Sequence, residues 1–99
     1  MQYVYQSYNT LCKTYSFPVM RDADPNVYGK QLHDFIILSP DQAKKERLDE
    51  CLIYCIGQFD QESGKILFAS EDQTGEIILD GVAAIKQLEA LKNAAAASN

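Results

Sequence analysis

The feature that most constrains this chain is a pair of apolar runs, over residues 51–59 and 65–68, separated by a short polar segment. That segment contains Gly64, which can adopt the positive φ that a hairpin loop requires, so the pattern predicts a β-hairpin. Side chains alternate between the two faces of a strand, and the first run is apolar on both faces. We therefore expect this strand in the middle of a sheet, with its second face covered by a helix or by another copy of the chain. Gly57 interrupts the run, and a glycine inside a strand indicates a bulge or a close approach of another backbone.

Three further strands are predicted around this hairpin. Residues 2–8 place Tyr3 and Tyr5 on one face of a strand and Val4 on the other, and residues 11–15 can pair back onto them after a turn at residues 9–10. Residues 76–79 form a last short apolar run. Together with the hairpin, these segments predict a small antiparallel sheet.

Helix signals separate the N-terminal strands from the hairpin. Asp24 is a favourable N-cap, and Pro25 suits the first helical position, where its missing N–H is harmless. The residue before a proline is pushed out of the α region, so this helix is predicted to end at Ser39, before Pro40. Ser39 is also predicted to cap a second, short helix through a capping box with Gln42.

The rest of that second helix, over residues 43–47, is expected to be mostly solvated, with Leu48 as its main core contact. A final helix follows Asp80, which is expected to be its N-cap. Its predicted packing stripe consists of Val82, Ile85, Leu88 or Glu89, and Leu91. The alanine-rich segment at the end has little to bury and is expected to fray. We therefore predict one α+β domain over residues 1–93, with a small antiparallel sheet, a central hairpin and two to three helices packed on one face, followed by a frayed tail over residues 94–99.

Composition favours a soluble intracellular protein. The 99 residues are 46% hydrophobic and include ten aromatic side chains, enough for a core without covalent staples. Three cysteines, an odd number, do not form a closed disulfide framework, which favours a reducing compartment. The N-terminus does not have the pattern of a signal peptide, and no apolar stretch approaches the ~18 residues of a membrane span. We expect no membrane association.

Charge is unevenly distributed along the chain. The net charge is −5, and residues 51–80 carry six acidic side chains against one basic side chain. Phosphate contacts dominate the affinity of proteins for nucleic acids, so this segment would repel DNA. Residues 1–30 carry three basic and two acidic side chains, which makes them the better candidate for a DNA-binding surface.

The sequence predicts neither catalysis nor a metal site. His33 is the one histidine, and adjacent helical residues such as Asp34 point about 100° away from it, so the two do not form an oriented general base. Cys51 and Cys55 lie roughly 13 Å apart on an extended strand at ~3.3 Å per residue, too far to share a tetrahedral ion. A buried cysteine acts as a small hydrophobic side chain instead. We expect a protein that is not an enzyme and holds no metal or other cofactor.

Tyrosines supply the candidate binding site. Four of the six lie in the first fifteen residues, close to basic side chains. Aromatic side chains on a sheet face, interleaved with basic groups, suit a single-strand binder because every base offers a π-face for stacking. The predicted nucleic-acid-binding residues are Tyr3, Tyr5, Tyr8, Lys13, Arg21 and Lys30. The alternative is that tyrosines simply favour strands and half-buried positions, and Tyr28 and Tyr54 are assigned to such packing. A homodimer, which we favour, would double the basic groups on one surface.

The central hairpin also carries a family resemblance. Residues 53–60 read Ile-Tyr-Cys-Ile-Gly-Gln-Phe-Asp, and Ser-Gly-Lys-Ile follows at residues 63–66. This stretch resembles the signature of the small non-structural protein of gokushovirus-type microviruses, which reads approximately LYxIGxFDxxTGxI. Asp49-Glu50 resembles that family's acidic pair, although Leu48 stands where proline is common and Ser63 replaces the usual threonine. The similarity is specific over residues 48–66 and looser over residues 17–37.

These microviruses are bacteriophages with small circular single-stranded DNA genomes. The resemblance therefore implies a phage-encoded, non-structural protein in the host cytoplasm rather than a capsid component. The leading prediction is an accessory protein that binds single-stranded DNA during genome replication, single-strand synthesis or packaging. The rival prediction is a non-enzymatic module that docks on a host or viral protein through its acidic hairpin turns. The residues predicted for that contact are Asp60, Glu62, Glu71 and Asp72.

Overall fold

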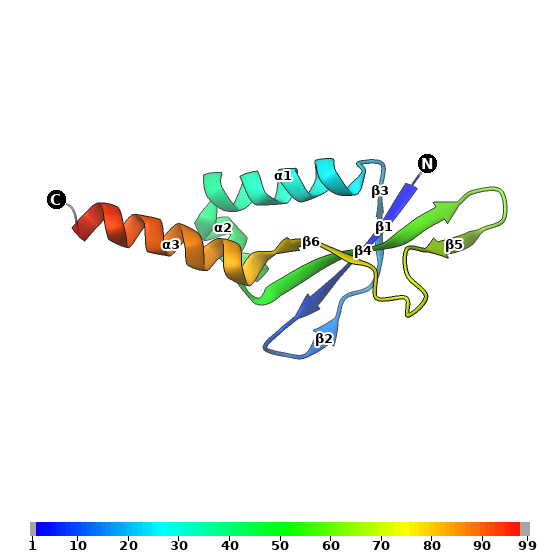
Figure 1. The fold of residues 1–99 in the computed structure, drawn as a ribbon, viewed down its shortest axis with the longest axis horizontal. Coiled ribbons are helices and arrows are strands. Elements are labelled where there is room, and N and C mark those ends of the chain that lie inside the picture. The colour runs from blue at the N-terminus through cyan, green and yellow to red at the C-terminus, as the bar shows by residue number, and fades with distance from the viewer. Residues whose placement is uncertain (1, 98–99) are drawn as a thin grey trace.

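A computed structural model describes residues 2–97 and shows an α+β fold, in which a six-stranded antiparallel sheet is combined with three α-helices (Figure 1). This confirms the predicted fold class. In chain order the elements are β1 (Gln2–Asn9), β2 (Thr14–Tyr15), β3 (Val19–Arg21), α1 (Pro25–Leu38), α2 (Pro40–Lys45), a 3-10 turn (Leu48–Glu50), β4 (Cys51–Asp60), β5 (Lys65–Phe68), β6 (Glu76–Asp80) and α3 (Gly81–Ala97).

Strand β4 is the centre of the sheet, as its two apolar faces predicted. Strand β1 pairs along one side of it. The other side is shared, since β6 pairs with residues 52–55 and β5 with residues 57–60. Strands β2 and β3 likewise share the outer edge of β1. The sheet is therefore long along β4 and narrow across it.

The predicted hairpin between β4 and β5 is confirmed, and so is the reason for its glycines. Gly64 lies in the connecting turn with a φ of 71°, in the left-handed region. A Cβ on Gly57 would lie 2.2 Å from the carbonyl oxygen of Leu67, so the close approach of β5 requires glycine there. The sheet also shifts register beside this point, between Val4 and Tyr5.

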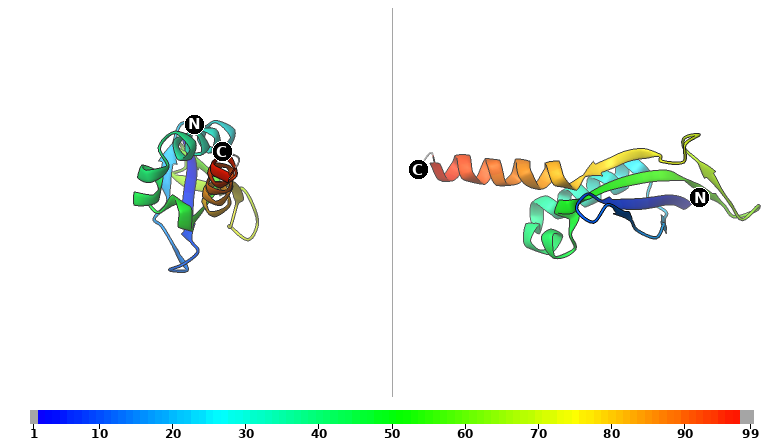
Figure 2. Two further views of the ribbon diagram at one scale, coloured as in Figure 1. Left: turned by 90° about the vertical axis from the view of Figure 1, so that its left-hand side faces the viewer. Right: turned by 90° about the horizontal axis from the view of Figure 1, so that it is seen from below.

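The helices cover one face of the sheet. Helix α1 lies along that face, and α3 begins where β6 ends (Figures 1 and 2). The buried cluster between the helices and the sheet contains Ile36, Ala43, Cys51, Ile53, Leu79 and Ile85. Because side chains alternate along β4, Leu52 and Tyr54 point to the opposite face. The right-hand view of Figure 2 shows the molecule from that side, with α1 behind the sheet. We call it the uncovered face because no described helix lies on it, although Val4 on this face is fully buried.

The helix signals at Asp24 and Asp80 are confirmed. The Asp24 carboxylate accepts a hydrogen bond from the Val27 amide at 2.9 Å, and the Asp80 carboxylate accepts one from Ala83 at 2.9 Å. Helix α1 ends before Pro40, as expected. The predicted capping box at Ser39 is wrong, because no side-chain hydrogen bond forms there. Ser39 also closes α1, and its ψ of 61° departs from the extended conformation of a normal N-cap.

The N-terminal strands differ from the prediction. The predicted strand over residues 11–15 is reduced to Thr14–Tyr15. The side-chain oxygen of Asn9 accepts hydrogen bonds from the Leu11 and Cys12 amides, which holds those residues in a turn. Strand β3 was not predicted, since it is short and follows a proline.

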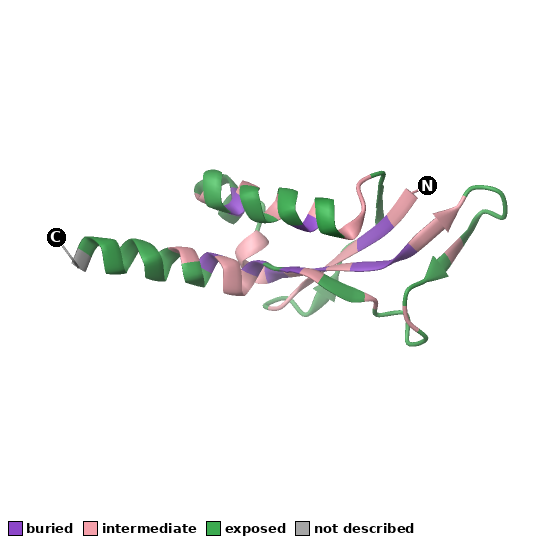
Figure 3. Cartoon of the chain, turned by 45° about the horizontal axis from the view of Figure 1, so that its top comes forward, coloured by how far each residue is buried: buried purple, intermediate pink, exposed green. Residues whose placement is uncertain are grey.

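The predictions for the later helices also need correction. Ala43 is completely buried, although its helix was expected to be mostly solvated. In α3 Ile85 packs as predicted, whereas Leu91 is 69% exposed. The C-terminal part of this helix is exposed and projects from the rest of the fold (Figure 3). The tail over residues 94–99 is helical as far as Ala97, in line with the high helix propensity of alanine, and its fraying stays a prediction. Residues 98–99 lie outside the described part of the chain.

Candidate nucleic-acid interface

Tyr5 lies on the covered face of the sheet, and its predicted role in stacking is wrong. Its side chain is 1% exposed, and its hydroxyl donates a hydrogen bond to the carbonyl oxygen of Ala23 at 2.6 Å. Its ring centroid lies 4.5 Å from that of Tyr28 on α1. Burial raises the pKa of Tyr5 well above its ordinary value. A side chain held in this way supports the fold and cannot meet a base.

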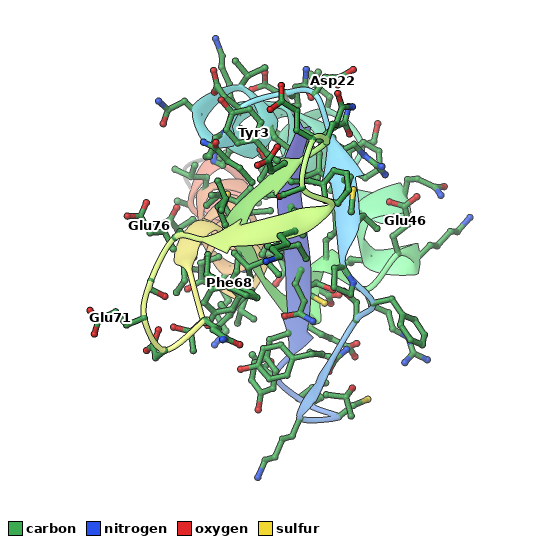
Figure 4. The ribbon with its side chains drawn as sticks, turned by 90° about the vertical axis from the view of Figure 1, so that its right-hand side faces the viewer. Tyr3, Asp22, Glu46, Phe68, Glu71 and Glu76 are labelled. Carbon is green, nitrogen blue, oxygen red and sulfur yellow. The ribbon has the colours of Figure 1, made fainter. Side chains whose placement is uncertain are left out.

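Tyr3 lies on the same face, two residues earlier on β1. It is half-buried and lines a cavity of about 350 Å³ together with Pro25, Cys55 and Glu76, among others. In Figure 4, Tyr3 lies on the side of the sheet that faces α1, and Phe68 lies on the opposite side of β5. Tyr3 is therefore separated by the sheet from Tyr8, the last tyrosine of β1.

Tyr8 lies on the uncovered face, because it is an odd number of residues from Tyr5 on the same strand. It pairs with Tyr15 of β2 in the register of the sheet, and the two ring centroids are 4.7 Å apart at an interplanar angle of 37°. Tyr15 is 58% exposed. Stacking between tilted rings at this distance fixes the ring of Tyr8 while the ring of Tyr15 remains accessible.

Tyr54 completes this group from the neighbouring strand. It pairs with Gln6 of β1, which lies on the same face as Tyr8. Burial raises the pKa of Tyr54, and the nearby hydroxyls of Tyr15 and Tyr8 add to the shift. Three tyrosines from three adjacent strands thus gather on the uncovered face, and we call Tyr8, Tyr15 and Tyr54 the tyrosine cluster.

The predicted basic residues do not gather around this cluster. Lys13 is exposed in the turn between β1 and β2, two residues before Tyr15 in the chain. Arg21 pairs with Tyr3 and so belongs to the other face, and Lys30 lies on α1. Lys13 is therefore the one member of the predicted basic set near the tyrosine cluster.

The acidic side chains also separate into two kinds. The Asp60 carboxylate accepts hydrogen bonds from the Glu62 amide and the Ser63 hydroxyl, and these bonds lower its pKa. Asp72 has the same role in the loop before β6, where bonds from the Ser70 and Thr74 hydroxyls lower its pKa. Both aspartates stabilise their own turns.

Glu62 and Glu71 are exposed in these two turns, and Figure 4 shows Glu71 on the outer side of its loop. Of the four acidic residues predicted to contact a partner, these two present carboxylates that are not part of the turn hydrogen bonds described above.

The other titratable side chains that the sequence singled out are His33, Cys51 and Cys55. His33 is exposed on α1. The thiols of Cys51 and Cys55 are buried, and burial raises the pKa of each, which disfavours the reactive thiolate. Within residues 2–97, no three histidine, cysteine, aspartate or glutamate side chains lie close enough together to hold a metal ion.

The spacing of the tyrosines could have separated Tyr8 from Tyr3 and Tyr5 on the basis of the sequence. Tyr5 and Tyr8 are three residues apart on a strand, so they had to face opposite sides, whereas Tyr3 and Tyr5 had to share one. The addition of Tyr54 required the pairing of β1 with β4, which joins residues about fifty positions apart.

Among the described residues, none of the helices has the length and apolar character needed to cross a membrane. In comparisons with protein-family models, curated proteins and solved structures, nothing matches this chain.

Proposed function

We propose that the protein binds single-stranded DNA on the uncovered face of its sheet, as a non-enzymatic accessory protein of a microvirus-type phage in the host cytoplasm. The observation that carries the proposal is the tyrosine cluster, three aromatic rings gathered on a sheet face without helical cover. The residues expected to contact DNA are Tyr8, Tyr15, Tyr54 and Lys13. They replace the larger set predicted from sequence, because Tyr3, Tyr5, Arg21 and Lys30 lie elsewhere.

Stacking would supply most of the affinity. A base that stacks on an aromatic side chain contributes about 1–3 kcal/mol, largely independently of sequence. The tilted pair of Tyr8 and Tyr15 exposes one ring to an incoming base and holds the other behind it. Because Lys13 is the main nearby cation, we expect few phosphate contacts and a shallow dependence on salt, about −0.7 in slope per contact.

The resemblance of residues 48–66 to a microvirus non-structural protein supports the type of ligand. Such phages pass through a stage in which their single-stranded genome must be made, protected or packaged. A small protein that stacks on unpaired bases without sequence preference fits any of these three steps.

Fluorescence anisotropy with a labelled oligo-dT, titrated at several salt concentrations, tests the proposal. Tyr15→Ala should weaken binding by about 5- to 150-fold, the equivalent of one lost stacking contact. Phe17→Ala is the matched control, since Phe17 is a 92% exposed aromatic residue outside the cluster. No saturable binding at low salt and micromolar protein would overturn the proposal, as would equal losses in both variants.

A second candidate function is docking on a host or viral protein through the acidic turns. It is favoured by the exposed carboxylates of Glu62 and Glu71 and by the acidity of residues 51–80. The double variant Glu62→Lys, Glu71→Lys separates the two functions. It should abolish capture of a basic protein partner if docking is correct, and leave DNA binding unchanged or stronger if stacking is correct.

A further inference from the structure

Helix α3 extends well beyond the body of the protein. It runs from Gly81 to Ala97, and every residue from Glu89 to Ala96 is exposed. Figures 1 and 3 show its C-terminal half projecting past α1 and α2. Isolated helices of this length are marginal in water even when rich in alanine. Most of the side-chain surface of this projecting half is therefore exposed and available for packing against another element.

An apolar stripe runs along the projecting helix. Ala84, Leu88, Leu91 and Ala95 follow one another at spacings of four, three and four residues, which is the seam pattern of a coiled coil. Three of them, Ala84, Leu88 and Leu91, line a groove of about 220 Å³ together with His33 and Ile37 of α1. Leu91 is 69% and Ile37 47% exposed, so the groove is open.

The stripe is complementary to itself when the second helix runs in the opposite direction. In an antiparallel pair, Leu88 of one copy meets Leu91 of the other, and Ala84 meets Ala95. A two-fold axis near residues 89–90 makes both halves of such an interface identical, as a closed dimer requires. The leucines fill the centre, and the alanines at either end permit a close approach of the helices.

Charge favours the same arrangement. Glu89 is directed away from the stripe, towards α2, where its carboxylate forms an ion pair with Lys44 at 2.6 Å. Lys86 and Lys92 lie off the stripe by helical spacing, so the seam itself carries no charge. The dipoles of two antiparallel helices also attract each other.

We propose that α3 pairs in antiparallel orientation with α3 of a second copy of this chain, forming a homodimer in which each groove beside α1 receives the other helix. A contact of about three helical turns would bury on the order of 1,000 Å² in total, at the lower end of specific interfaces. We expect a reversible dimer with a dissociation constant in the micromolar range, on the order of that of other small interfaces. The proposal does not depend on DNA binding, because the interface lies away from the uncovered face.

Sedimentation equilibrium of the full chain, from about 1 to 200 µM, tests the dimer. The wild-type chain should show a reversible monomer–dimer equilibrium, and Leu91→Glu should weaken it at least about tenfold by placing a carboxylate against Leu88 of the second copy. The control is Ile77→Glu, at a 53% exposed position on the uncovered face, and this variant should dimerise normally. Circular dichroism should show that both variants fold, since both positions are exposed.

Orientation is tested by the double variant Leu88→Lys, Leu91→Glu. An antiparallel pair places each lysine against a glutamate, which should restore much of the association that Leu91→Glu loses. A parallel pair would place like charges together and would not recover. The proposal is overturned if the wild-type chain stays monomeric over the whole range, if Ile77→Glu and not Leu91→Glu dissociates the dimer, or if the double variant fails to recover.

Discussion

Tyr5 and Tyr8 lie on the same strand, three residues apart, and the fold uses them in opposite ways. Tyr5 packs under α1 with its hydroxyl bound to Ala23, whereas Tyr8 packs against Tyr15 on the face that no described helix covers. Residue type is therefore a poor guide to function in this sheet. The face on which a tyrosine lies decides whether it can meet a ligand.

The largest expected effect is a difference in protein stability between a tyrosine substitution on the covered face and one on the uncovered face. Tyr5→Ala should lower the free energy of unfolding by about 3–5 kcal/mol, because it leaves a cavity under α1. Tyr15→Ala, at an exposed position, should cost less than about 1 kcal/mol. Urea denaturation measures both. If Tyr5→Ala does not fold, Tyr5→Phe should still cost about 1–3 kcal/mol by leaving the Ala23 carbonyl unpaired. Equal costs at the two tyrosines would contradict the assignment of the faces.

A second contrast lies in the β4–β5 hairpin, between Gly57, which is paired on both sides inside β4, and Gly64 in the open turn. Gly57→Ala should destabilise the protein by about 1–3 kcal/mol, because the added methyl group meets the backbone of Leu67. Gly64→Asn is the matched control, since nothing lies within 4 Å of a Cβ there and asparagine tolerates a positive φ. Thermal unfolding of the two variants should differ clearly. Similar melting temperatures would mean that β5 does not approach β4 as closely as described.

The smallest expected effect is a pH dependence that comes from the covered face. Burial raises the pKa of Tyr5, so the folded protein keeps a proton that the unfolded chain releases above about pH 10. Stability is thus fully present below that pH and falls as the pH rises, by up to about 1.4 kcal/mol per unit. Urea unfolding of wild type and Tyr5→Phe between about pH 9 and 11 should show a shallower fall in the variant. Some slope should remain, because burial also raises the pKa of Cys51 and Cys55. Parallel curves would contradict the burial of the Tyr5 hydroxyl.

Local patterns were sufficient to predict much of the fold. The apolar runs of the hairpin, Gly64, and the caps at Asp24 and Asp80 each act over a few residues, and each is found where the sequence placed it. The predictions failed where an outcome depended on distant segments. The burial of Ala43 follows from its contact with the core cluster, and β3 exists because it finds the edge of β1.

In the candidate site, too, local patterns were predictable from the sequence, whereas features that depend on distant segments were not. Alternation along β1 could have separated Tyr5 from Tyr8, but which face α1 would cover could not be read from either residue. The sequence predicted only packing for Tyr54, because tyrosines favour strands and half-buried positions. Its place beside Tyr8 and Tyr15 depends on the pairing of β1 with β4.

The central claim, that the uncovered face of the sheet binds single-stranded DNA, is tested most directly by NMR. Tyrosine ring signals of the full chain would be followed during titration with oligo-dT. We expect the signals of Tyr8, Tyr15 and Tyr54 to shift and saturate together, while those of Tyr5 and Tyr28 remain unchanged. Absence of any saturable shift, or shifts confined to the covered face around Tyr3 and Arg21, would contradict the claim.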